Sequence, residues 1–69
     1  MNEQDFVDIV TARHGWAVGD QAQHILNGDD FDQQNDNALR YIMKDARKYE
    51  DYQDLAERIK DYLTKQEAK

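Results

Sequence analysis

Cysteine, proline and serine are absent from this chain of 69 residues, and glycine occurs only three times. Without cysteine, neither a disulfide nor a thiolate metal site can form. Without serine or cysteine, a nucleophile activated as in a Ser-His-Asp triad is excluded. The lack of proline and the scarcity of glycine favour long, uninterrupted secondary-structure elements.

Long apolar runs are also absent, so the sequence predicts neither a transmembrane helix nor the apolar core of a signal peptide. The first residues, MNEQDF, are polar and acidic, which is the wrong chemistry for export or organelle targeting. We therefore expect a soluble cytoplasmic protein that does not associate with membranes.

The length predicts one small domain over residues 1–69. A chain of this size buries only about 60% of the surface that its unfolded form exposes. Because no disulfide can reinforce so small a core, its stability must come from regular helix packing, from self-association or from a partner.

The net charge of −6 is unevenly distributed along the chain. Residues 1–36 contain eight acidic side chains and one basic side chain, whereas residues 37–69 contain seven acidic and eight basic ones. The overall acidic balance argues against general nucleic-acid binding, which needs a positive field to displace counterions.

The second half of the sequence has the clearest helical period. In YEDYQDLAERIKDYLTK the apolar residues recur at the spacing of one helix face, which predicts a helix over residues 51–66. In the preceding segment, NALRYIMKDARKYE, the apolar residues also share one helix face. This face extends back to Phe31, which predicts a helix over residues 30–49. Neither proline nor glycine separates the two segments, so one continuous helix over residues 30–66 is an alternative.

Two shorter helices are expected in the first half. The first covers residues 3–14, with Asn2 as a plausible N-cap and Gly15 as the stop. The second covers residues 17–27, where Asn27 followed by glycine supplies a terminator.

No segment alternates apolar and polar residues as a half-buried strand does. The sequence therefore predicts an all-α fold, a small bundle of about four helices without β-strands. The expected core consists of Phe6, Ile9, Val10, Trp16, Val18, Ile25, Leu26, Phe31, Leu39, Ile42, Met43, Ala46, Leu55, Ile59, Tyr62 and Leu63.

The stretch GDDFDQQNDN is rich in oxygen ligands, but its spacing does not fit a calcium loop. An EF-hand loop needs glycine at its sixth position and a glutamate at its twelfth. Starting the loop at Asp30 or at Asp32 provides neither residue. We therefore expect no calcium site.

The same stretch has the composition of a helix start. Asp29 or Asp30 can act as an N-cap, the pair Asp30 and Gln33 has the spacing of a capping box, and Phe31 would point inward. The alternative is a mobile loop, with the helix starting at Asp36.

The two histidines, His14 and His24, lie ten residues apart with Asp20 between them. Because no helix would present two of these ligands one turn apart, we predict no metal site and no other cofactor. A bundle of this size also has little room for a substrate pocket, so we predict that the protein is not an enzyme.

The most distinctive surface feature is a basic helix face formed by Arg40, Lys44, Arg47 and Lys48, with Tyr41 at its edge. This spacing puts the four cations on one side of a helix. Such a face can dock an acidic protein partner, lie in solvent, or pair with the acidic first half of the chain. A recognition helix for nucleic acid is the less favoured alternative, because Asp45 borders the face and the first half would repel phosphate.

Two further hypotheses use other features. The acidic first half could imitate a phosphate backbone and act as a DNA mimic. A homodimer could form through tyrosines that two helices cannot all bury, since tyrosine is enriched at interfaces. These tyrosines are Tyr41, Tyr49, Tyr52 and Tyr62.

Together, these observations predict a small acidic helical module for protein–protein interaction or regulation, without catalytic activity. Its predicted partner-binding residues are those of the basic face, and the partner itself is an unidentified protein. The size and composition suit an accessory protein of a bacterium or a phage.

Overall fold

The computed structural model describes residues 1–68. It contains four α-helices, which are α1 (Glu3–His14), α2 (Trp16–Leu26), α3 (Asp36–Ala46) and α4 (Gln53–Glu67). Two single 3-10 turns, η1 (Phe31–Gln33) and η2 (Glu50–Tyr52), precede α3 and α4. The described part of the chain has no strand, so the predicted all-α fold of four helices is confirmed.

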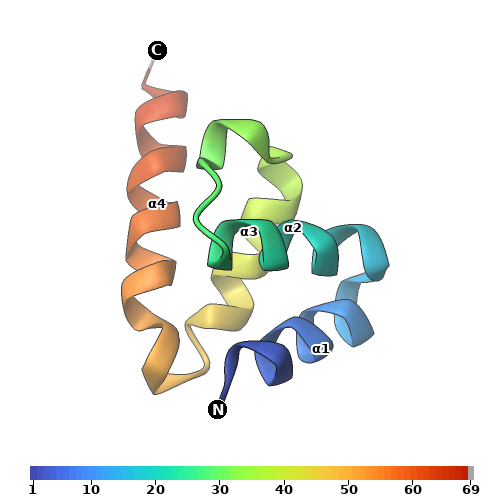
Figure 1. Ribbon diagram of the computed structural model, residues 1–69. Helices are drawn as coiled ribbons and strands as arrows, with labels where there is room; N and C mark the ends of the chain where they lie inside the picture. The colour runs from blue at the N-terminus through green and yellow to red at the C-terminus, as the bar shows by residue number, and fades with distance from the viewer. Residues whose placement is uncertain (69) are drawn as a thin grey trace.

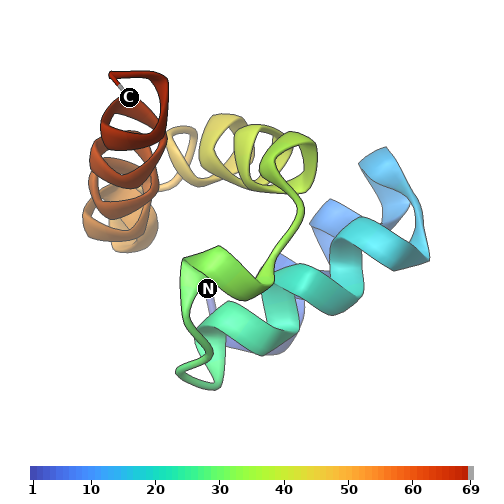
Figure 2. The same ribbon diagram turned by 90° about the horizontal axis from the view of Figure 1, so that it is seen from above.

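The helices pack as two pairs that meet at α3 (Figure 1). The first pair consists of α1 and α2, and the second consists of α3 and α4. Helix α3 also contacts both helices of the first pair, and the view from above shows it between that pair and α4 (Figure 2). The basic face predicted on α3 is therefore carried by the central helix of the fold.

Local sequence signals define α1 as predicted. The Asn2 side chain accepts a hydrogen bond of 2.8 Å from the backbone N–H of Asp5, which caps the first turn. Gly15 ends the helix with a φ of +96°, a left-handed conformation that favours glycine. Helix α2 begins at the next residue, so this single glycine turns the chain between the two helices.

Helices α1 and α2 approach each other closely at Gly19. A Cβ atom at this position would collide with the side chain of Thr11 and would lie 3.2 Å from its Cα atom. Thr11 cannot move away freely, because its hydroxyl donates a hydrogen bond of 2.8 Å to the carbonyl of Val7. The buried glycine is therefore what allows the two helices to cross at this distance.

One apolar core joins all four helices. Phe6, Val10, Leu39, Ile42 and Ile59 are fully buried in it. The other buried apolar residues are Val7, Ala22, Ile25, Ala38, Ala46, Tyr52, Leu55, Ala56 and Leu63. Half-buried apolar side chains pack around them, among them Val18, Leu26, Phe31, Met43, Tyr49 and Tyr62.

Trp16 was predicted in the core, and this prediction is wrong. Its side chain is 73% exposed. It follows Gly15 directly and occupies the first turn of α2, on the side that faces away from the core. Ile9, also predicted in the core, is half-buried.

Helices α3 and α4 are separate, which excludes the single long helix over residues 30–66. Tyr49 adopts an extended backbone, with φ −125° and ψ 131°, and breaks the helical path. The ring of Tyr52 stacks on Phe6 at 4.3 Å between centroids, and Tyr49 meets the same ring edge-on at 6.4 Å. The Gln53 side chain donates hydrogen bonds of 2.8 Å to two carbonyls at this corner, those of Arg47 and Tyr49.

The predicted start of the third helix near Asp30 is wrong, because α3 begins at Asp36. Asn35 is the N-cap, and its side chain accepts hydrogen bonds from the backbone N–H groups of Asn37 (2.9 Å) and Ala38 (3.3 Å). The N–H of Asn35 itself donates to the Gln21 side chain of α2 at 2.6 Å. Asp30 is extended and forms no side-chain cap. The alternative start at Asp36 is thus the observed one.

Phe31, in the turn η1 before α3, points inward as predicted and packs against the core. Its ring meets the Tyr62 ring edge-on at 5.7 Å, and the guanidinium of Arg58 lies 5.5 Å above it. Both partners belong to α4, so η1 fastens the segment between α2 and α3 to the last helix. Among residues 1–68, no helix has the length and apolar character needed to cross a membrane.

Candidate interaction surface

The five residues predicted to bind a partner lie at α3 and its C-terminal end. Arg40, Tyr41 and Lys44 are in the helix, Arg47 is its C-cap, and Lys48 follows. Four of them lie in two environments, one facing α1 and the other facing α4. Tyr41 and Lys48 belong to the first, and Arg40 and Lys44 belong to the second. Arg47 is exposed and belongs to neither.

The environment facing α1 is organised around a buried carboxylate. The side chain of Asp45 is only 2% exposed. One of its oxygens lies 3.2 Å from Nε of Arg13, and the other lies 2.9 Å from Nε2 of His14. The ammonium group of Lys48 is 3.9 Å away. Buried carboxylates require such partners, because removing a charge from water is costly.

Tyr41 is fixed by the same cluster. Its ring stacks on the imidazole of His14, with 4.6 Å between centroids and an angle of 17° between planes. Despite this stack, Tyr41 is 44% exposed. The α1 side of the basic face thus joins α1 to α3. Two of the basic side chains around Asp45, those of Arg13 and His14, come from the first half of the chain.

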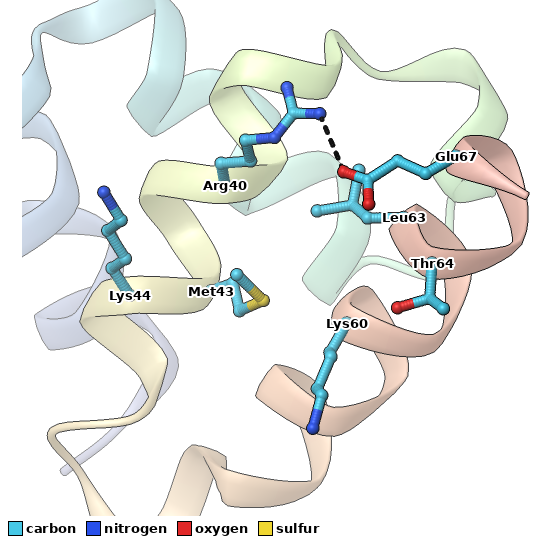
Figure 3. Close-up of a pocket in the computed structure, with 7 residues that line it drawn as sticks. All are labelled: Arg40, Met43, Lys44, Lys60, Leu63, Thr64 and Glu67. Carbon is cyan, nitrogen blue, oxygen red and sulfur yellow. Dashed lines mark ion pairs between the residues drawn. The ribbon is translucent and has the colours of Figure 1, made fainter.

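The environment facing α4 is a shallow groove between α3 and α4 with a volume of about 220 Å³ (Figure 3). Met43 and Leu63 provide its apolar surface, and Thr64 adds a hydroxyl. Three cations surround it, Arg40 and Lys44 from α3 and Lys60 from α4. A single carboxylate, that of Glu67, lies among them and leaves a local charge of +2.

The cations around the groove differ in their partners. Arg40 pairs with Glu67 at 3.5 Å across the groove and also donates a hydrogen bond of 3.2 Å to Asn37 (Figure 3). Within residues 1–68, neither Lys44 nor Lys60 takes part in an ion pair. In the close-up their ammonium groups extend outward at the edges of the groove.

Sequence reasoning did not assign to this surface five residues that line the groove: Met43, Lys60, Leu63, Thr64 and Glu67. The spacing of Lys60 and Leu63 puts them on one side of a helix, which is a usable signal. Their position opposite Arg40 and Lys44 is not encoded locally, because it depends on how α4 folds back against α3. Asp45 was noted only as a border of the basic face, whereas it organises the α1 side.

The two histidines form separate contacts. His14 contacts Asp45, and Nδ1 of the exposed His24 lies 3.2 Å from the Asp29 carboxylate. Over residues 1–68, no three His, Asp or Glu side chains converge closely enough to hold a metal ion.

Three of the four tyrosines pack against phenylalanine rings of their own chain, and the fourth, Tyr41, stacks on His14. Tyr49 and Tyr52 pack against Phe6, and Tyr62 packs against Phe31. Burial, together with the nearby carboxylates of Asp36 and Asp32, raises the pKa of the Tyr62 hydroxyl.

Comparisons with protein families, with curated proteins and with solved structures found no match.

Proposed function

We propose that this protein is a small, non-catalytic interaction module that docks an acidic segment of a partner protein on the α3 face and the adjoining groove. The observation that carries the proposal is the concentration of cations around an apolar groove in a chain whose net charge is −6. Two of these cations, Lys44 and Lys60, form no ion pair with the residues described. A local reversal of charge of this kind favours a partner of the opposite sign.

A protein partner accounts for this surface better than nucleic acid does. Phosphate backbones are bound through many cations that displace counterions, and the acidic first half opposes such binding. Part of the basic face is moreover occupied internally, since Lys48 lies beside Asp45. An apolar floor between α3 and α4 suits an amino-acid side chain and has no use in contacts with phosphate.

The size of the groove supports binding without catalysis. Ligand pockets usually enclose about 300–1,000 Å³ and surround most of a small molecule. The groove here is smaller and open to solvent, with Met43 and Leu63 as its apolar lining. It suits one projecting side chain of a larger partner.

Homodimerisation through tyrosines has less support than a partner protein of different sequence. The hypothesis requires several exposed tyrosines, whereas Tyr41 is the only exposed one within residues 1–68. An acidic partner also explains the cations, which self-association through aromatic rings does not.

The proposal can be tested by affinity capture with the full-length protein as bait in extracts of its native host. We expect a retained protein whose binding weakens as salt rises and is lost in Lys44→Glu. Lys65→Glu is the matched control, since it makes the same charge change at an exposed position of α4 outside the groove. Equal capture by both variants, capture of nucleic acid alone, or no retained protein would contradict the proposal.

A further inference from the structure

We propose that the groove between α3 and α4 is an anchor site for one large apolar side chain, flanked by acidic residues, in the partner segment. This inference rests on the proposed function and specifies the chemistry of the partner. It also assigns a role to Glu67, which would occupy the position of a partner carboxylate in the free protein.

The dimensions of the groove fit a single side chain. Its volume of about 220 Å³ lies below the range of about 300–1,000 Å³ that is usual for small-molecule pockets. Interfaces often gain most of their binding free energy from one or a few side chains that enter such a depression. The groove is therefore large enough for an anchor residue but too small for a whole peptide.

Its apolar residues combine a fixed base with an adaptable wall. Leu63 is buried and belongs to the core, so its position is set by the packing of α4. Met43 is only half-buried and points into the space between α3 and α4 (Figure 3). Because a methionine side chain is flexible and polarisable, it can adjust to different apolar anchors.

The charges around the groove indicate which residues flank the anchor. Lys44 stands on the α3 side and Lys60 on the α4 side, with Met43 between them (Figure 3). If acidic residues precede and follow the apolar anchor in the partner sequence, one carboxylate can contact Lys44 and the other can contact Lys60. An acidic helix or turn with a central apolar residue has this arrangement.

Glu67 is the feature that makes the inference specific. Its carboxylate lies 3.5 Å from Arg40, and both side chains are well exposed, at 68% and 42%. An exposed ion pair of this length contributes little to stability, so a partner carboxylate can replace it at low cost. Glu67 then competes with the partner for Arg40 and also repels its acidic residues.

The test begins with a library of random 12-residue peptides displayed on phage and selected against the immobilised full-length protein. We expect the selected peptides to share a large apolar residue with acidic residues on both sides. Replacing that apolar residue by alanine should weaken binding at least about tenfold, as expected for an anchor that buries a large side chain. No enrichment, or enrichment of peptides without acidic residues, would overturn the inference.

Three variants at exposed positions then locate the site by fluorescence anisotropy with one selected peptide. Lys60→Gln should weaken binding about threefold or more, whereas Glu67→Gln should tighten it by about two- to fivefold, the range expected for removing an exposed charge contact. Lys65→Gln, outside the groove, should bind as the unmodified protein does. A weaker complex with Glu67→Gln would contradict the competitor role, and unchanged binding in both groove variants would place the peptide elsewhere.

The two proposals can fail separately. If a captured partner depends on Lys44 but ignores Lys60→Gln, Glu67→Gln and truncation of the anchor, the docking face stands and the groove inference is wrong. If neither a partner nor a peptide is bound, both are wrong. Sedimentation that shows a dimer abolished by Lys60→Gln would assign the groove to a second copy of the chain, which would also overturn the acidic-partner inference.

Discussion

Nε2 of His14 lies 2.9 Å from a carboxylate oxygen of the buried Asp45, and this contact ties the C-terminal end of α1 to the C-terminal end of α3. The second oxygen of the same carboxylate lies 3.2 Å from Nε of Arg13. Two consecutive residues of α1 therefore hold one buried acid of α3. The contact joins the first helix pair to the second without passing through the apolar core.

We expect Asp45→Asn to destabilise the protein by about 1–3 kcal/mol, because the basic residues lose their buried anion. The cost stays below that of breaking a fully buried pair, since Arg13 and Lys48 are about half exposed and can be solvated in its place. Urea unfolding followed by circular dichroism measures the change. The exposed Asp61→Asn is the control and should change stability by less than about 0.5 kcal/mol. Equal stabilities of the two variants would show that the cluster contributes nothing.

Asn35→Ala should destabilise α3 by about 0.5–2 kcal/mol, because the side chain caps two backbone N–H groups. Asp30→Ala is the matched control, since Asp30 provides no side-chain cap and should cost less than about 0.5 kcal/mol. Thermal or urea unfolding of both variants tests the helix start directly. A larger loss in Asp30→Ala than in Asn35→Ala would favour the earlier start inferred from periodicity.

Trp16→Ala should cost less than about 1 kcal/mol, although removing a core tryptophan costs about 3–5 kcal/mol. The side chain is 73% exposed, so truncation leaves no cavity. Unfolding curves followed by circular dichroism give the stability, and acrylamide quenching of the single tryptophan gives its exposure independently. A loss of several kcal/mol together with weak quenching would place Trp16 back in the core.

Helix boundaries set by local chemistry could be predicted from the sequence. Asn2 and Gly15 bound α1 because a cap and a left-handed glycine act on adjacent backbone groups. The start of α3 depends instead on contacts with other helices. Phe31 lies on the extended apolar face whether it belongs to a helix or to a 3-10 turn, so periodicity could not separate the two. The contacts with Gln21 and Tyr62 decide the outcome.

The candidate site was likewise only partly predictable. Helical spacing placed Arg40 and Lys44 on one face, since both belong to a single helix. The groove needs Lys60 and Glu67 from α4 as well, and their position depends on the corner between the two helices. That corner is held by the stacking of Tyr52 on Phe6, a contact between residues far apart in the sequence. No local pattern encodes it.

Gly19→Ala should destabilise the protein by about 1–2 kcal/mol, although alanine has a higher helix propensity than glycine. Propensity alone would stabilise α2 by about 1 kcal/mol. The added methyl group would collide with Thr11, and forcing atoms into a packed contact costs about 1–3 kcal/mol or more. Urea unfolding measures the balance. Adding Thr11→Ala to this variant should recover part of the loss, whereas a Gly19→Ala protein more stable than the original would show that the helices separate easily.

Stability at alkaline pH should depend on Tyr52. Burial raises the pKa of its hydroxyl, and the nearby carboxylates of Glu3, Asp51 and Asp5 raise it further. The folded state therefore retains this proton at a pH where the unfolded chain releases it, so stability falls as the pH rises above the ordinary tyrosine pKa of about 10. Below that pH both states are protonated and the hydroxyl contributes no pH dependence.

Tyr52→Phe should remove this part of the alkaline loss while retaining the stack on Phe6. Urea midpoints of the two proteins should be offset by a constant amount between pH 7 and 9. The midpoint of the original protein should then fall more steeply between pH 10 and 11.5. All other side chains are the same in both proteins, so the difference between the two curves isolates Tyr52. Parallel curves across the whole range would mean that the Tyr52 hydroxyl loses its proton as easily in the folded protein as in the unfolded chain.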